Sequence, residues 1–295
     1  MKSVLLLVTI WSGLLVACSP ERKAEPMPAR TKTTVVTDSQ TLVLAVQPTI
    51  DCLPLYYAAE KGLFKKVGAR VFLKSYNSQA DCDTAYINKS TDGGVTDLVR
   101  LCYHRNRGEK LEVISGTDNE WAVVVSGKLR IRNLTALKKH SIAISRFSAA
   151  HYLLTDLLKE EKITPTDILP VQINDYKLRT EMLDENQIDA AILSEPYVAL
   201  AKSKGHHILI NKFYSLNLGC IVLRKESVSN KLKNKQIPLF IKAYNMAADS
   251  INKLGKNKIS DILSIRYQLP EKAIDSLKLP HYRHASIPER IDYCL

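Results

Sequence analysis

The chain has 295 residues, and its 42 lysine and arginine side chains outnumber its 30 aspartate and glutamate side chains to give a formal net charge of +12. The basic residues are scattered in short groups without interleaved aromatic side chains. This pattern excludes a nucleic-acid groove, so we expect no nucleic-acid partner. About 255 residues follow residue 40, which is more than one small core needs and indicates one large domain or two lobes.

The first residues have the features of an export signal. Lys2 supplies a positive charge, and an apolar run that ends at Ala17 is too short for a stable membrane span. The sequence LVAC, which ends at Cys18, has the form of a lipobox. We therefore expect a signal peptide over residues 1–17 and lipidation at Cys18. The alternative is an ordinary signal peptide in which this cysteine is incidental.

The segment over residues 18–40 is expected to be a flexible tether. It contains three prolines and several charges but no aromatic residue, so it cannot bury enough apolar surface to fold. Together with a lipidated Cys18, it would hold the folded part outside the cytoplasm, anchored to a bacterial membrane in the periplasm or at the cell surface.

From residue 41 onward, short apolar runs alternate with amphipathic segments. The runs predict strands over residues 41–46, 70–76, 93–98, 111–115, 121–126, 141–145, 169–173, 190–193, 207–210 and 218–223. The segments between and after them predict helices over residues 53–61, 82–88, 99–107, 149–162, 177–186, 196–203, 239–254, 259–265 and 270–277. This alternation is typical of an α/β protein with mostly parallel sheets that are flanked by helices.

Three stretches carry a resemblance to a known family: PLYYAAEKGLFKKVGARV (54–71), SIAISRFSAAHYLLTDLLKEEKI (141–163) and LDENQIDAAILSEPYVALAKSKG (183–205). In their order and spacing they resemble the substrate-binding proteins of nitrate/sulfonate/bicarbonate/taurine-type ABC transporters, which include thiamine-pyrimidine binders. The resemblance implies a periplasmic binding protein type II fold, in which two α/β lobes are joined by two crossing strands. Lobe one would comprise residues 41–120 and 219–295, and lobe two residues 121–218.

This resemblance implies a solute-binding lipoprotein of an ABC importer, which captures a small polar molecule between its lobes. Its partners would be the ligand, the permease with its ATPase, and the membrane through the lipid anchor. We expect a monomer with no catalytic residues, no metal and no cofactor. Two alternatives remain: an enzyme on the same fold, of the cofactor-precursor or menaquinone-pathway type, or a surface lipoprotein that binds another protein. The lipobox favours export over a cytosolic enzyme.

Candidate binding residues follow the carboxyl ends of the predicted strands, where open α/β sheets bind ligands. They are Pro48, Thr49, Asp51, Cys52, Asp81, Cys82, Asp83, Asp97, Arg146, Ser148, Ala149, Asn174, Asp175, Glu195 and Tyr197. Arg146 is the single cation among them, and an acidic lining would favour a ligand with a positive or hydrogen-bond-donating group.

Some of these residues have simpler explanations. Ser148 and Ala149 begin a predicted helix whose free N–H groups could bind an anion, although Ser148 could equally be a plain N-cap. Asp81 and Asp97 could likewise cap helices, and Asp83 could face water.

The cysteines show no metal-binding spacing. Cys52 and Cys82 each follow a strand expected to neighbour the other, so their loops could be joined by a disulfide, with two free thiols as the alternative. Cys102 and Cys220 are expected to be core residues.

Overall fold

The computed structural model describes residues 38–210 and 217–288. The expected signal peptide, Cys18, and the tether up to residue 37 lie outside these ranges. Asp38 to Gln40 form a turn in which the Thr41 N–H donates to the Asp38 carbonyl oxygen, and the Asp38 carboxylate pairs with Arg70. Residues 38–40, the last three of the predicted tether, therefore belong to the folded structure.

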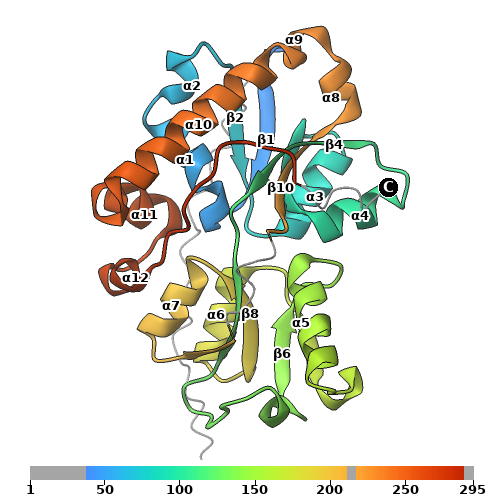
Figure 1. The fold of residues 1–295 in the computed structure, drawn as a ribbon, viewed down its shortest axis with the longest axis vertical. Helices are drawn as coiled ribbons and strands as arrows, with labels where there is room; N and C mark the ends of the chain where they lie inside the picture. Colours follow the sequence, from blue (N-terminus) through green and yellow to red (C-terminus); the bar gives the residue numbers. More distant parts are fainter. Residues whose placement is uncertain (1–37, 211–216, 289–295) are drawn as a thin grey trace, which may run out of the picture. The chain divides into compact units, whose positions relative to one another are not determined.

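Two five-stranded sheets organise the fold (Figure 1). The first sheet has the order β2-β1-β3-β10-β4, and its strands are β1 (Leu42–Val46), β2 (Val71–Ser75), β3 (Gly93–Asp97), β4 (Leu111–Thr117) and β10 (Gly219–Arg224). The second sheet has the order β7-β6-β8-β5-β9, and its strands are β5 (Trp121–Val125), β6 (Ser141–Ile144), β7 (Leu169–Gln172), β8 (Ala190–Ser194) and β9 (His207–Ile210).

Each sheet contains one strand that runs against the others. In the first sheet β10 is antiparallel to both β3 and β4, and in the second sheet β5 is antiparallel to both β8 and β9. These two strands are the ones that follow each passage of the chain between the sheets, because β5 succeeds β4 and β10 succeeds β9. The predicted fold class, with mostly parallel sheets joined by two crossings, is confirmed.

The helices flank the sheets. They are α1 (Leu53–Glu60), α2 (Leu63–Lys66), α3 (Gln79–Ile87), α4 (Leu98–Arg105), α5 (Ala149–Glu160), α6 (Tyr176–Asp184), α7 (Tyr197–Ser203), α8 (Lys225–Ser229), α9 (Lys231–Asn234), α10 (Gln236–Leu254), α11 (Ser260–Tyr267) and α12 (Glu271–Ser276). The predicted strands and helices are confirmed to within a few residues at their ends. The short helices α2, α8 and α9 were not predicted, since segments of four or five residues show no periodicity. No helix in the described ranges is both long and apolar enough to cross a membrane.

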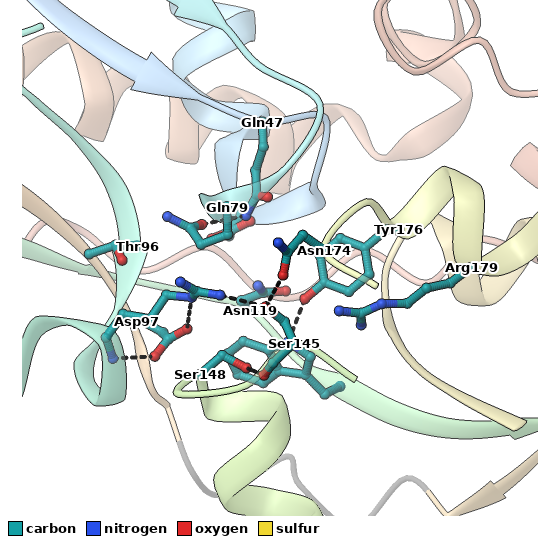
Figure 2. Close-up of a pocket in the computed structure, with 13 residues that line it drawn as sticks. Gln47, Gln79, Thr96, Asp97, Asn119, Ser145, Ser148, Asn174, Tyr176 and Arg179 are labelled. Atoms are coloured by element: carbon teal, nitrogen blue, oxygen red, sulfur yellow. Dashed lines mark hydrogen bonds and ion pairs between the residues drawn. The ribbon is translucent and has the colours of Figure 1, made fainter. Parts of the chain in front are cut away.

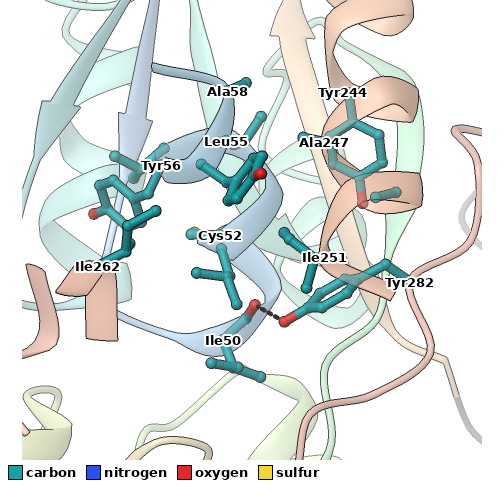
Figure 3. Close-up of a cluster of buried hydrophobic side chains, with 14 of the residues drawn as sticks. Ile50, Cys52, Leu55, Tyr56, Ala58, Tyr244, Ala247, Ile251, Ile262 and Tyr282 are labelled. Atoms are coloured by element: carbon teal, nitrogen blue, oxygen red, sulfur yellow. Dashed lines mark hydrogen bonds between the residues drawn. The ribbon is translucent and has the colours of Figure 1, made fainter. Parts of the chain in front are cut away.

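Side-chain alternation along β1 assigns a helical layer to each face of the first sheet. Leu44 and Val46 pack into a large apolar cluster with α1 and α10, whereas Ala45 points the other way, toward α3. Figure 3 shows part of the large cluster, where Tyr282 closes over the 3₁₀ turn Ile50–Cys52. The Tyr282 hydroxyl donates to the Ile50 carbonyl oxygen at 2.8 Å. The turn after β1 is therefore held by the core, and this turn carries one of the site residues.

The possible disulfide between Cys52 and Cys82 is not formed, and the alternative of two free thiols is confirmed, because both are free and buried. Cys52 packs with Val46 on one face of β1, and Cys82 packs with Ala45 on the other. The sequence predicted that the loops carrying the two residues are adjacent. In the structure the two side chains lie on opposite faces of β1, which keeps the thiols apart. Cys220 is a buried core thiol, as expected, whereas Cys102 is disulfide-bonded instead of being a core thiol.

Candidate functional site

A pocket lies at the carboxyl ends of strands from both sheets (Figure 2). We call it the central pocket. Its lining comprises Gln47, Asp51, Gln79, Thr96, Asp97, Arg100, Asn119, Trp121, Ser145, Ser148, Asn174, Tyr176 and Arg179. Its empty volume of about 370 Å³ includes space that is open to solvent. Most of these side chains are polar, so the pocket suits a polar molecule.

Asp51 enters the pocket from the turn after β1. Two buried tyrosines fix this turn, since Tyr267 donates to the Thr49 carbonyl oxygen at 3.1 Å and Tyr282 donates to that of Ile50. Asp51 is 1% exposed, and its Oδ2 accepts from the Thr117 hydroxyl at 3.2 Å. Burial raises the pKa of Asp51, against the hydrogen bonds from Thr49 and Thr117. Its other oxygen, Oδ1, has no partner among the described residues.

A chain of side-chain hydrogen bonds supports the same wall of the pocket. Gln47 Nε2 donates to Gln79 Oε1 at 2.7 Å, and Gln79 Nε2 donates to Asp83 Oδ1 at 2.9 Å. This arrangement orients both amides and leaves Gln47 Oε1 without a donor among the described residues.

Asp83 lies behind the pocket wall and joins several side chains. Its carboxylate accepts from Tyr86 at 2.7 Å, from Arg100 Nη1 at 2.7 Å, and contacts His104 Nε2 at 3.2 Å. Burial alone would raise the pKa of Asp83, but the contacts with His104, Arg100, Gln79 and Tyr86 together lower it. The carboxylate is therefore ionised at neutral pH, and it compensates the charge of Arg100.

Arg100 connects the two sheets. It extends from α4, and its Nη2 donates to the Ser145 hydroxyl, in the loop after β6, at 2.5 Å. Ser145 in turn bonds Asn174 Oδ1 at 2.9 Å in the loop after β7. The pocket is thus spanned by side chains that belong to both sheets.

Asp97 also connects the two sheets. Its Oδ1 caps α4 by accepting the Arg100 N–H at 2.9 Å, and the Ala149 N–H, at the first turn of α5, also donates to its carboxylate. Burial raises the pKa of Asp97 to about 6, although Arg100 and these N–H groups oppose the shift. The predicted anion site at the start of α5 is therefore filled by a carboxylate of the protein itself. Ser148 caps this helix, and its hydroxyl donates to the Ser145 carbonyl oxygen at 2.6 Å.

Arg179 enters from α6 on the side of the second sheet. Its Nε donates to the Ile173 carbonyl oxygen at 2.7 Å and its Nη1 donates to that of Ile192 at 2.6 Å. The guanidinium lies 4.7 Å from the ring centre of Tyr176, whose hydroxyl accepts from the Trp121 indole at 3.0 Å. Arg179 is 0% exposed, and burial lowers its pKa to about 10, so it stays charged at neutral pH. Its Nη2 has no partner among the described residues.

Five buried polar atoms without a hydrogen bond in the described structure belong to residues that line this one pocket. Three are acceptors: Gln47 Oε1, Asp51 Oδ1 and Asn119 Oδ1. Two are donors without a hydrogen bond: Arg179 Nη2, and Arg100 Nε, which lies 3.8 Å from Asp97 Oδ2 in an ion pair. Buried polar groups in proteins are nearly always hydrogen-bonded, so a concentration of exceptions in one pocket indicates a site for a polar molecule.

The structure brings four of the predicted binding residues into this pocket: Asp51, Asp97, Ser148 and Asn174. The other predicted residues lie outside its lining: Pro48, Thr49, Cys52, Asp81, Cys82, Asp83, Arg146, Ala149, Asp175, Glu195 and Tyr197. Asp83 is buried instead of facing water, Asp175 caps α6, and Asp81 is exposed and bonded to Ser78. Arg146 is exposed, and the cations of the pocket are Arg100 and Arg179 instead. The expected excess of acid in the cleft is therefore not present.

Glu195 lines a separate pocket, which we call the side pocket, together with Glu120, Lys202 and Lys278. Its Oε2 accepts the Ala199 N–H at 3.0 Å in the first turn of α7. Burial raises the pKa of Glu195 to about 7, partly opposed by the Ala199 and Lys278 N–H groups and by Lys202. The carboxylate follows β8 as predicted, but it turns toward its own helix and away from the central pocket.

Sequence reasoning missed the site residues that helices contribute. Arg100 lies three residues after the cap of α4, and Arg179 lies on the buried face of α6 with Tyr176 and Leu183. An arginine at an i, i+3, i+7 position of an otherwise apolar face was the signal that could have found Arg179. Asn119 lies in the crossing between β4 and β5, two residues after the end of β4, where the predicted strand over residues 111–115 had ended earlier, and Trp121 is the first residue of β5, at the end of the strand opposite to the carboxyl end.

The structure is similar to solved binding proteins. It superposes on the ligand-binding component of an ABC-type import system from Staphylococcus aureus, solved with zinc bound, with a TM-score of 0.73 and 17% identity over 86% of this chain and 89% of that one. The alkanesulfonate-binding protein SsuA from Xanthomonas axonopodis pv. citri, bound to MOPS, gives a TM-score of 0.73 and 18% identity over 86% and 89%. The nitrate-binding protein NrtA from Synechocystis PCC 6803 gives 0.70 and 16% over 85% and 74%.

At these identities the structural matches establish the fold, which is that of periplasmic binding proteins. A comparison of the sequence with curated proteins gives no significant match. The sequence model of the NMT1/THI5-like family matches residues 49–252, which include every strand of the two sheets except β1 and every residue that lines the central pocket except Gln47. The chain belongs to the NMT1/THI5-like family.

Proposed function

We propose that the chain is an extracytoplasmic solute-binding protein of an ABC importer and that it holds a small polar molecule in the central pocket. The observation that carries this proposal is the set of five buried polar atoms without a hydrogen bond in that pocket. Leaving such an atom unsatisfied costs roughly 1–3 kcal/mol, so a ligand that satisfies several of them has a large source of binding free energy.

Entry of a ligand requires movement, because contacts between the two sheets border the pocket. Arg100 bonds Ser145, Ser78 forms a β-bridge with Asp175, and the rings of Tyr103 and Phe147 stack at 4.6 Å. We propose that lobe one (41–120 and 219–295) and lobe two (121–218) open about the two crossings and close on the ligand. The two antiparallel strands, β5 and β10, each follow one crossing of the chain between the lobes. We propose that these crossings act as the hinge.

Trp121 provides a direct readout of binding. The sequence has two tryptophans, and Trp11 lies in the expected signal peptide, so Trp121, in the pocket wall, would be the single indole of the processed protein. We expect a member of a polar metabolite library to change its fluorescence and to stabilise the protein, by about 2.7 kcal/mol at a hundredfold excess over Kd. Asn119→Leu should weaken this response about tenfold, whereas Asn106→Leu, at an exposed position after α4, should not.

Equal responses in both variants would exclude the central pocket as the binding site. Mass spectrometry of the ligand after incubation separates transport from catalysis: recovery of the unchanged molecule supports a binding protein, and a converted product would favour an enzyme on this fold.

The anchor is a proposal that the LVAC sequence at residues 15–18 supports. Lipidation at Cys18 would hold the protein beside a permease and its ATPase, to which it would deliver the solute. Cys18→Ala should move the protein out of the detergent phase in a phase-partitioning experiment. If partitioning is unchanged in this variant, the protein is not anchored through this cysteine.

A further inference from the structure

Arg179 presents a positive charge that no carboxylate of the described residues neutralises through an ion pair. Its Nε and Nη1 bond backbone carbonyl oxygens, which are uncharged, and its third nitrogen, Nη2, has no partner there. Figure 2 shows the guanidinium directed from α6 toward the middle of the group of pocket residues. A buried guanidinium held in this way is preorganised to bind an anionic or strongly accepting group.

Asp51 is the acidic side chain of the pocket that likewise has no partner of opposite charge among the described residues. Its Oδ2 accepts from a hydroxyl, its Oδ1 has no partner among the described residues, and no lysine, arginine or histidine among them forms an ion pair with it. The acceptors Gln47 Oε1 and Asn119 Oδ1, likewise without donors, line the same pocket. This group of oxygens suits a protonated amine or another group with several N–H donors.

The remaining charges of the pocket are already used within the protein. Arg100 pairs with Asp83 at 2.7 Å and lies 3.8 Å from Asp97. Asp97 in turn receives N–H groups from the first turns of α4 and α5. Neither Arg100 nor the start of α5 is therefore free to neutralise a charged ligand, which leaves Arg179 and Asp51.

These two residues come from different sheets. Asp51 follows β1 of the first sheet, and Arg179 lies on α6, against the second sheet. A molecule with charges of opposite sign at its two ends can bind both, and it would join the two lobes.

We infer that the solute of the central pocket is dipolar, with an anionic carboxylate or sulfonate group bound by Arg179 and an amine or N–H-rich group bound by Asp51. This inference rests on the proposed binding function and specifies its ligand class. A simple oxyanion would leave Asp51 unpaired, and a simple amine would leave Arg179 unpaired, so each would lose one end of the site.

Matched probes test the inference by calorimetry on the full chain in detergent. One series is β-alanine, propionate and propylamine; a second is taurine, ethanesulfonate and ethylamine; longer ω-amino acids with the corresponding acids and amines vary the distance between the charges. We expect a dipolar probe to bind about 10- to 100-fold more tightly than both of its single-ended analogues.

Variants assign each end of the ligand. Asp51→Asn should reduce the preference for the dipolar probe over the anion-only analogue, and Arg179→Gln should reduce the preference over the amine-only analogue. Asp81→Asn, at an exposed carboxylate outside the pocket, should change neither. Because Arg179 also bonds two backbone carbonyls, Arg179→Gln could fail to fold, and then Asp51→Asn with its control decides the test.

A single-ended or neutral solute that binds as tightly as every dipolar probe would overturn the ligand class and leave solute binding intact. The same holds if no dipolar probe binds while the metabolite library yields a ligand without two opposite charges. Failure of the whole library to bind would instead count against the proposed function.

Discussion

Replacing Asp83 with alanine is expected to lower the free energy of unfolding by about 3–5 kcal/mol. The carboxylate is buried and accepts from Tyr86, Arg100 and Gln79, so its removal leaves the Arg100 charge uncompensated in the interior. Since the folded-state pKa of Asp83 is lowered, its stabilising contribution is present above the ordinary pKa of 3.8 and is lost as the pH falls through the lower value.

Urea unfolding at pH 7 measures this effect. Asp81→Ala is the matched control, because Asp81 lies two residues earlier on α3 but is exposed, and it should cost about 1 kcal/mol or less. If the two variants lose the same stability, Asp83 does not join the pocket wall to Arg100 as described.

The second large effect is a gain in the free energy of unfolding. Glu195→Gln is expected to raise the free energy of unfolding at pH 8 by about 2 kcal/mol, because it removes a charge that the folded protein disfavours. Burial raises the pKa of Glu195 from 4.5 to about 7, and partial exposure of the side chain reduces the full value of that shift. The amide can still accept the Ala199 N–H, so the start of α7 keeps its hydrogen bond.

The sign of this effect depends on pH. With the folded pKa raised, the wild-type contribution is fully present below about 4.5 and is lost as the pH rises through about 7. The difference between wild type and Glu195→Gln should therefore be small near pH 4.5 and largest above pH 7. Urea unfolding at both pH values measures it, with Glu181→Gln at an exposed position as the control. A pH-independent difference, or a loss of stability at pH 8, would show that the carboxyl is not held in this way.

The sequence predicts well those site residues that follow the carboxyl ends of strands. Short apolar runs mark where β1, β3, β6 and β7 end, and a parallel arrangement gathers those ends at one edge, so Asp51, Asp97, Ser148 and Asn174 could be placed together. The family resemblance supplied the pairing of the sheets and the two crossings, which local periodicity does not contain.

The rest depended on contacts between residues far apart in the chain. Asp97 and Arg146 look alike as charged residues after strands, yet one is buried against α5 and the other is exposed. Glu195 is oriented toward α7, where it accepts the Ala199 N–H, and this contact cannot be read from its position after a strand. The buried arginines lie on helix faces, where a sequence pattern normally predicts apolar core.

Native mass spectrometry of the full chain purified from its own host, in parallel for wild type and Asn119→Leu, tests the central claim most directly. The wild type should carry one small polar molecule per chain, which is released on unfolding, and the variant should carry markedly less. A wild-type protein with no bound molecule, or equal occupancy in both proteins, would contradict a solute site in the central pocket.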